Sequence, residues 1–227
     1  MAVIKRMSLV DQVYEKLKDK IVQLKIPFGS KLNVSKLQEE YGVSSTPVRE
    51  ALNRLLNEGL IEFENNVGAR VIDITEDDVR RIQEVSFAYE MAAARYAMKR
   101  GDREGMIREI GQYIEEYKNS QGVIESCSCI RNIKAVFHKN SDNAMLIDSM
   151  ESLNGLDQVL HSLFSMPREK GGSGEFYHTG ISYFETIYKA IQNDDFASVC
   201  DGLEGHQLWA RKYIVKNLET VKEQQGK

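Results

Sequence analysis

The stretch VSSTPVREALNRLLNEGLIEFENNVGARVID, residues 43–73, decides the fold of the first part of this chain. It opens with hydroxyl residues and a proline, which are typical of a helix N-terminus, and Thr46 is the expected N-cap. Apolar residues then recur at helical spacing until Gly59: Val48, Ala51, Leu52, Leu55 and Leu56. From there to Asp73, two short strand-like runs surround a turn that contains Gly68, so we expect a helix followed by a β-hairpin.

Two further helices are expected before this stretch. Residues 9–24 place apolar side chains at helical spacing with charges between them, and Pro27 and Gly29 stop the pattern. Residues 34–41 form a shorter pattern of the same kind, which ends at Gly42. Three short helices followed by a hairpin describe a winged helix-turn-helix, whose second motif helix enters the major groove of DNA.

The rest of the chain reads differently. An acidic break, DITEDDV, is followed by apolar stripes at helical spacing almost to the C-terminus. We therefore expect a mainly α protein with an N-terminal winged helix-turn-helix and a small β-hairpin wing, and a C-terminal all-α helical bundle. The expected boundaries are 1–73 for the first domain, 74–79 for a linker, 80–222 for the bundle and 223–227 for a tail.

Composition and charge narrow the class of protein. With 42% hydrophobic and 28% charged residues, the chain of 227 residues can bury a core and is not disordered. No apolar run reaches the roughly 20 residues of a membrane span, and no signal-peptide pattern is present, so we expect a cytoplasmic protein without a membrane partner. The three cysteines are an odd count and are read as reduced thiols. Residues 1–72 hold 11 Lys and Arg against 9 Asp and Glu, or +2 of a total of −4, so the first region suits a polyanion better than the second.

Candidate DNA-binding residues gather at the N-terminus of the third helix and around the wing. A helix N-terminus presents backbone N–H groups to phosphate, and Arg49 faces away from the apolar stripe, where it can reach a guanine or a phosphate. The alternative is that Arg49 pairs with a nearby acid and that Gly68 merely permits a turn. The candidate set is Ser44, Ser45, Thr46, Arg49, Arg54, Gly68 and Arg70.

The run GSKLNVSKLQEEYGVSSTPVREALNRLLNEGLIE, residues 29–62, resembles the GntR family of bacterial transcription regulators, whose signature includes TPVREAL and a GL before the wing. EDDVRRIQEVSFAYEMAAARYA, FHKNSDNAML, YKAIQNDDFASV and His206 resemble the helical FCD effector domain of that family's FadR branch. The resemblance implies that Arg49 contacts a base or phosphate and that Gly68 is the wing-tip glycine. Many relatives have an arginine where this chain has Ser45, which implies an altered operator readout.

FCD domains typically hold a divalent metal through an aspartate, a histidine one turn later, and two more histidines. Mapped onto this chain, His138 and His206 match the first and last histidine, whereas Lys134 replaces the aspartate and Phe184 the middle histidine. Ser86 stands where such domains commonly have an arginine. An ammonium at about 4 Å from a divalent ion costs several kcal/mol of repulsion, so we expect no metal cofactor; His138 and His206 are the weak candidates for one.

Lys134 suits an anionic ligand instead. The predicted effector-binding residues are Lys134, His138, Phe184, His206 and Ser86, with Phe184 as an apolar wall. Two alternatives remain open: Lys134 points to solvent while both histidines are core residues, or the pocket is vestigial.

The function hypothesis is a ligand-responsive bacterial transcriptional regulator that binds a palindromic operator in double-stranded DNA as a homodimer. We expect a repressor, the commoner behaviour in the family, and a small organic or sugar acid as effector. An enzyme is disfavoured because the chain lacks a nucleophile elbow, a phosphate loop and a complete metal set. A protein-interaction module is the third class.

Overall fold

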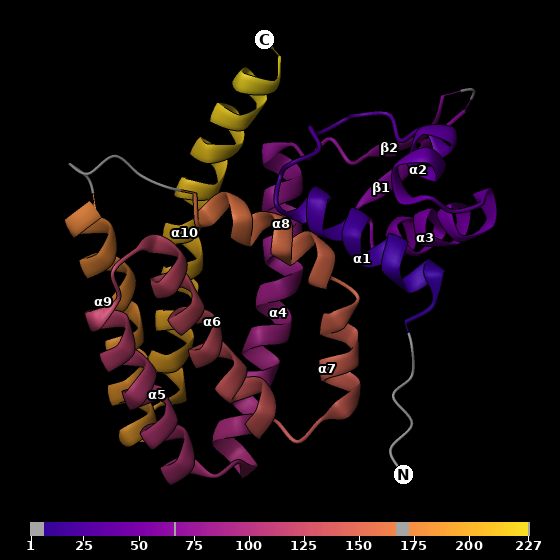
Figure 1. Ribbon diagram of the computed structural model, residues 1–227. Coiled ribbons are helices and arrows are strands. Elements are labelled where there is room, and N and C mark those ends of the chain that lie inside the picture. The colour runs from indigo at the N-terminus through magenta and orange to yellow at the C-terminus, as the bar shows by residue number, and fades with distance from the viewer. Residues whose placement is uncertain (1–6, 66, 167–172, 227) are drawn as a thin grey trace.

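The computed structural model describes residues 7–65, 67–166 and 173–226 (Figure 1). Its first part contains α1 (Leu9–Val22), α2 (Val34–Tyr41), α3 (Ser45–Asn57), β1 (Ile61–Glu64) and β2 (Gly68–Val71). The second part contains α4 (Glu76–Arg100), α5 (Arg103–Asn119), α6 (Val123–Asn140), α7 (Ala144–Glu151), α8 (Asn154–Phe164), α9 (Ser173–Gln192) and α10 (Phe196–Gln225). The mainly α fold with a small hairpin is confirmed. No helix of the described residues is long and apolar enough to cross a membrane.

The first part is a winged helix-turn-helix, as the periodicity predicts. Its core side chains come from the inward stripes of all three helices, among them Leu17, Leu37 and Leu52. The strands β1 and β2 pair antiparallel, with Ile61 opposite Val71 and Glu64 opposite Gly68. Ala69 and Val71 are buried while Gly68 and Arg70 are less so, which is the alternation of a strand with one face on a core.

One helix start differs from the sequence prediction. The N-cap of α3 is Ser44, two residues before the expected Thr46, and its side chain makes no capping hydrogen bond. The helix α4 begins at Glu76, after its N-cap Thr75, and α10 continues to Gln225, so helix occupies part of the ranges 74–79 and 223–227. Propensity fixes such ends poorly, because a helix that packs against a neighbour continues for as long as that contact lasts.

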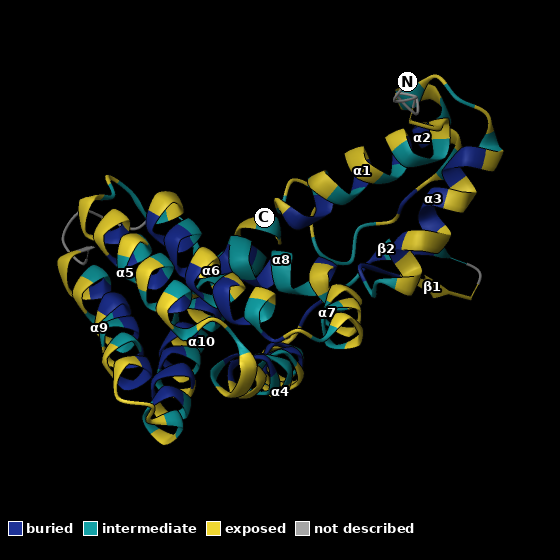
Figure 2. Cartoon of the chain, turned by 90° about the horizontal axis from the view of Figure 1, so that it is seen from below, coloured by how far each residue is buried: buried dark blue, intermediate teal, exposed yellow. Residues whose placement is uncertain are grey.

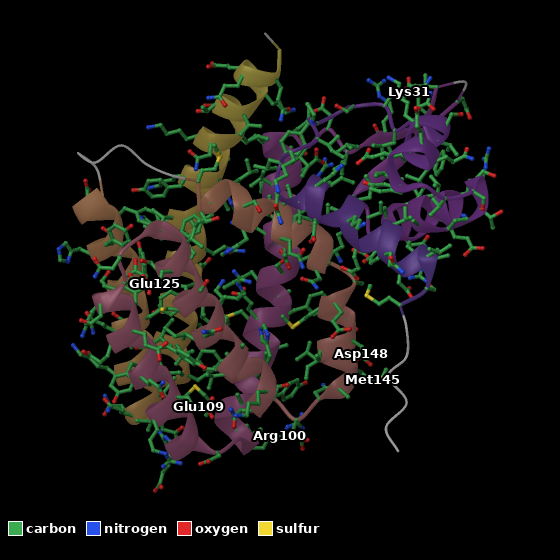
Figure 3. The ribbon with its side chains drawn as sticks, in the orientation of Figure 1. Lys31, Arg100, Glu109, Glu125, Met145 and Asp148 are labelled. Atoms are coloured by element: carbon green, nitrogen blue, oxygen red, sulfur yellow. The ribbon has the colours of Figure 1, made fainter. Side chains whose placement is uncertain are left out.

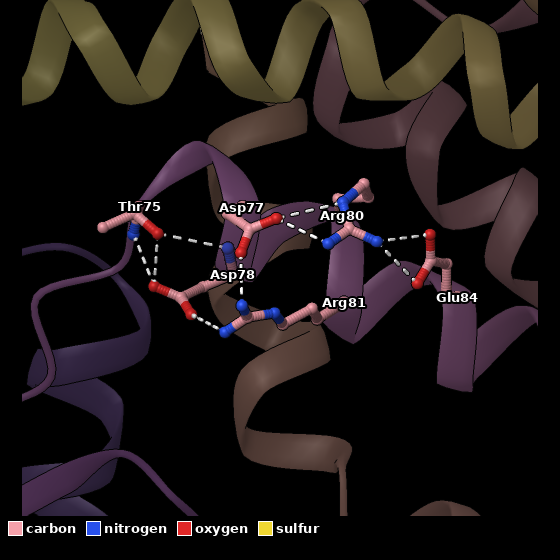
Figure 4. Close-up of polar contacts among 6 residues, drawn as sticks. All are labelled: Thr75, Asp77, Asp78, Arg80, Arg81 and Glu84. Carbon is pink, nitrogen blue, oxygen red and sulfur yellow. Dashed lines mark hydrogen bonds and ion pairs between the residues drawn. The ribbon is translucent and has the colours of Figure 1, made fainter.

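The start of α4 is fixed by local polar contacts (Figure 4). Thr75 and Asp78 form a capping box, in which the Thr75 hydroxyl accepts a hydrogen bond from the Asp78 amide and the Asp78 carboxylate accepts one from the Thr75 amide. Arg80 pairs with Asp77 and Glu84 on the next turn. The chain therefore changes direction between wing and bundle at a defined residue.

The helices of the second part enclose two hydrophobic cores. One core lies among α4, α5, α6, α9 and α10 and includes Ile110, Phe137 and Phe184. The other is shared with the winged helix-turn-helix, because residues of α8 and α10 such as Leu163 and Leu218 join it. In Figure 2 the buried faces of the bundle helices point inward, and α8 lies where the two parts meet.

The two parts pack tightly against each other at the start of α8. A Cβ atom on Gly155 would lie 2.9 Å from Leu60 Cδ1 and 2.9 Å from Glu58 Oε2, so only glycine fits this approach without a shift. On the other side, Leu156 packs against Gly59. Lys222 of α10 also pairs with Asp73, at 2.6 Å. The winged helix-turn-helix is thus docked on the bundle through α8 and the end of α10.

Candidate nucleic-acid interface and candidate ligand pocket

The N-terminus of α3 presents an uncommitted polar cluster. Ser44 and Thr46 are exposed and Ser45 is half-buried. Because Ser44 makes no capping hydrogen bond, its hydroxyl and the first backbone N–H groups of α3 are available to an external acceptor. The positive end of the helix dipole at this place favours an anion such as phosphate.

Arg49 lies one turn further along α3. Its neighbours Val48 and Leu52 are buried in the core, whereas Arg49 is exposed. It has no ion pair or hydrogen-bonded side-chain partner among the described residues, so the alternative of pairing with a nearby acid is not realised there. A free guanidinium offers five N–H donors and matches both a guanine edge and a phosphate.

Arg54 and Arg70 differ from Arg49, because each is held within the domain. Arg54 Nη1 lies 2.7 Å from Asp11 Oδ1, and its guanidinium stacks 5.7 Å from the Tyr14 ring centroid. Arg70 donates to Glu64 at 2.7 Å and to the Gly29 carbonyl at 2.8 Å. Exposed ion pairs contribute about 0–1 kcal/mol, so a phosphate can compete for either arginine. Their DNA contacts stay predictions beside an observed structural role.

Gly68 stands at the wing tip with φ of +96°, a conformation that side-chain-bearing residues rarely adopt. No atom lies within 4 Å of the position of a Cβ there. The glycine is therefore required by the turn and not by crowding, and the tip is open to a groove.

A pocket of about 520 Å³ lies in the helical part, in the size range of small-molecule sites. Side chains of α4, α6, α7, α8 and α10 line it. Four of the five predicted effector-binding residues are among them: Ser86, Lys134, His138 and His206. The structure thus brings together residues from three helices that the sequence separates by up to 120 positions.

Phe184 does not line this pocket. It is fully buried on α9, and its ring centroid lies 4.7 Å from that of His206. Because Phe184 belongs to the core among α4, α5, α6, α9 and α10 and is not among the lining residues, it supports the imidazole from the core side. Its expected role as a wall for a ligand is not what the described geometry offers.

Lys134 is partnered across the pocket. Its ammonium lies 2.7 Å from Glu90 Oε1, and both side chains are mostly buried. The alternative in which Lys134 points to solvent therefore does not hold. Only one of its three N–H groups has a partner among the described residues, which leaves two for a ligand.

Three imidazoles surround this ammonium and are kept neutral. Burial lowers the pKa of His138 and lowers that of His206 well below its ordinary value, and the Lys134 charge adds to both effects. Burial lowers the pKa of His161 to about 4, helped by Arg131 and Lys134. Arg131 Nη2 lies 2.8 Å from His161 Nε2, and since a guanidinium only donates, this nitrogen is the acceptor of a neutral ring.

The donor set does not fit a divalent metal. No group of three His, Cys, Asp or Glu with suitable geometry occurs in the part of the chain that the structure describes. Lys134 brings an ammonium into the same pocket as His138 and His206, where it repels a cation, and Phe184 offers no ligand atom. The lining residues therefore do not form a site for a divalent metal.

Sequence reasoning missed all three carboxylates that line the pocket, Glu90, Glu151 and Asp157. Asp157 Oδ1 accepts a hydrogen bond from the Ser86 hydroxyl at 2.7 Å. Burial raises the pKa of Asp157 to about 6, against the lowering effect of this hydrogen bond. The sequence does contain a pattern that points to Asp157. Asp157 and His161 are four residues apart on one helix face, which is the aspartate–histidine spacing typical of FCD domains, whereas Lys134 replaces the aspartate before His138.

Because the pKa of Asp157 is raised in the folded state, the free energy of unfolding should depend on pH. The folded state holds this proton more tightly than the unfolded state, so the stabilisation is complete at low pH and is lost as pH rises from about 4 through about 6. Asp157→Asn should therefore increase the free energy of unfolding at pH 8 by about 2–3 kcal/mol, and less at pH 5. Urea unfolding across pH 5–8 measures it. The exposed Asp148→Asn is the control, and a pH-independent difference for Asp157→Asn would contradict the prediction.

Comparison with known proteins bears on the first part of the chain. Residues 9–71 match the family model described as bacterial regulatory proteins, gntR family. The HTH-type transcriptional regulator BphR of Paraburkholderia xenovorans is 31% identical over 106 residues, which cover 47% of this chain and 43% of that protein. The gluconate operon transcriptional repressor of Bacillus subtilis is 32% identical over 109 residues, which cover 48% of this chain and 44% of that protein. The chain thus spans less than half the length of these curated relatives.

A solved structure extends the likeness in fold to nearly the whole chain. E. coli McbR/YncC superposes with a TM-score of 0.61 at 21% identity and covers 96% of this chain and 99% of its own. At that identity the likeness shows the fold alone. The helical part therefore has a known architecture, while its ligand has to be argued from its own residues.

Proposed function

We propose that this chain, whose N-terminal part is a winged helix-turn-helix of the GntR family, is a transcription regulator that binds a palindromic operator as a homodimer. The observation that carries the proposal is the exposed, unpaired Arg49 beside the open N-terminus of α3. Relatives named as transcriptional regulators, one of them a repressor, support it. We further propose that the regulator acts as a repressor and that it works in the cytoplasm.

The second part of the proposal concerns control by a ligand. The pocket in the helical part holds Lys134 with two uncommitted N–H groups and imidazoles without partners, which supports a small organic acid as effector. Such a pocket in a bundle of this architecture supports placement of the chain in the FadR branch, with an FCD-type domain. Ligand binding would change operator affinity if the two states of the dimer bind it differently.

Salt dependence tests the DNA-binding part. Duplexes selected from a randomised library by the purified protein should contain an inverted repeat, and each should bind two chains. Affinity should fall by about 100-fold or more between 50 and 200 mM salt, because neutralised phosphates release counterions. Fluorescence anisotropy with labelled duplexes measures both the stoichiometry and the slope. Binding that ignores salt, or a library that yields no repeat, would refute an operator-binding dimer.

A further inference from the structure

The pocket does not have the charge of a site for a simple acid. Among the described lining residues, two carry positive charge, Arg131 and Lys134, and three carry carboxyl groups, Glu90, Glu151 and Asp157. The lining imidazoles contribute no charge, since burial keeps them neutral. A ligand with only a carboxylate would therefore enter a lining with a small excess of negative charge.

Two lining carboxylates, the half-buried Asp157 and the exposed Glu151, have no ion pair among the described residues, and Asp157 is the less exposed of the two. Glu90 pairs with Lys134, but Asp157 has no ion pair among the described residues and accepts only the Ser86 hydroxyl, on Oδ1. Its other oxygen is left for a donor from the pocket. A carboxylate that is partly removed from water is normally paired with a cation, so a positively charged N–H group suits this free oxygen.

Hydrogen-bond donors suited to a carboxylate lie around Lys134. The ammonium keeps two N–H donors after its bond to Glu90. His206 is only 3% exposed and lines the pocket, yet neither of its ring nitrogens has a partner among the residues that the structure describes, and the same holds for His138 Nε2. A buried imidazole with no partner indicates that a ligand completes its hydrogen bonds. A carboxylate fits here, because each neutral imidazole can donate one N–H to it.

Part of the pocket wall is apolar and uncovered. Ile147 and Met150 of α7 line the pocket, but none of the residues of α7 is buried. An apolar side chain of a ligand would cover them on the pocket side. Met145, in contrast, lies on the outer side of α7 and is 81% exposed (Figure 3).

We propose that the effector is an amino-carboxylic acid with an apolar side chain. Its ammonium group pairs with Asp157, its carboxylate accepts hydrogen bonds from Lys134 and the unpaired imidazoles of His138 and His206, and its side chain lies against α7. This inference rests on the proposed function and narrows the class of the effector from an acid to a zwitterion.

Matched compounds separate the two groups of the ligand. Leucine is compared with 4-methylpentanoate, which lacks the amine, and with 3-methylbutylamine, which lacks the carboxylate; phenylalanine, 3-phenylpropanoate and 2-phenylethylamine form a second set. Isothermal titration of the full-length protein should show at least one of the two amino acids binding about tenfold or more tighter than both of its partners, because each charged hydrogen bond is worth about that much.

Variants assign the groups to residues. Asp157→Asn should remove the preference for the amino acid over its deaminated partner, and its expected higher stability at neutral pH rules out unfolding as the cause. Lys134→Ala should weaken the amino acid and the deaminated acid alike. Asp148→Asn, on the exposed side of α7 (Figure 3), is the matched control and should bind as the wild type does.

The possible failures can be told apart. If the deaminated acids bind as tightly as the amino acids, or if Asp157→Asn keeps the preference, the zwitterion is wrong while an acid effector stands. If none of the six compounds binds, the zwitterion with an apolar side chain is wrong, whereas the acid effector of the proposed function, a class of which the six include only two members, is not overturned. Operator binding is judged independently by the salt titration.

Discussion

Trp209→Ala is expected to lower the free energy of unfolding by about 3–5 kcal/mol, the largest effect of any single substitution considered for this protein. The Trp209 ring lies at the centre of an aromatic cluster, with ring centroids 4.8 Å from Phe176 and 5.2 Å from Tyr213. It also contacts His206, at 5.5 Å. Truncation removes these contacts and leaves a cavity that the surrounding α-helices cannot close.

Thermal and urea unfolding monitored by circular dichroism measure this effect. The neighbouring Leu208 is 49% exposed, so Leu208→Ala should stay within about 0.5 kcal/mol of the wild type. Because Trp209 packs on the back of His206, the variant should also bind any pocket ligand more weakly. A loss below about 1 kcal/mol would mean that the cluster is not a packed core.

Arg49→Ala is expected to reduce operator affinity by roughly 10- to 100-fold, the value of one well-placed arginine contact to a base. The side chain is exposed and has no partner in the described protein, so the substitution should leave the unfolding transition unchanged. Fluorescence anisotropy with the selected duplex measures the affinity. Arg108→Ala on α5 is the matched control, because it removes another exposed arginine, from the bundle.

The pattern of the loss identifies the kind of contact. If Arg49 reads a base, duplexes altered at one position should lose their disadvantage in the variant. If it holds a phosphate, all duplexes weaken alike and the salt slope falls by about one unit. Unchanged affinity for every duplex would remove Arg49 from the interface.

The fold of the first part follows from local pattern, but its helix ends do not. The alternation around Gly68 and the stop at Gly59 predict the hairpin and the end of α3 correctly, because both positions need a backbone with positive φ. The expected N-cap of α3, Thr46, lies two residues after the observed one. Three successive hydroxyl residues are equally good N-caps, and the true one, Ser44, forms no capping bond that could distinguish it.

The pocket was predictable only along single helices. Lys134 and His138 are one turn apart, so their common face follows from sequence spacing. Their partners do not: Glu90 is 44 positions from Lys134, and Asp157 is 71 from Ser86. Such contacts depend on how α4, α6 and α8 pack, which periodicity does not specify. The position of Phe184 could not be predicted for the same reason. Helical spacing shows that Phe184 faces inward on α9, but it does not distinguish a core residue from a pocket wall.

The close contact at Gly155 couples the thermal unfolding of the two parts. The helix α8 carries Asp157 and belongs to the same hydrophobic core as α3. The winged helix-turn-helix therefore cannot lose its packing without exposing the buried residues of α8 to water. The chain then behaves as one cooperative unit. By mass action, a compound that binds only the native pocket raises the opening free energy of amides in α3 as well, although it touches none of them.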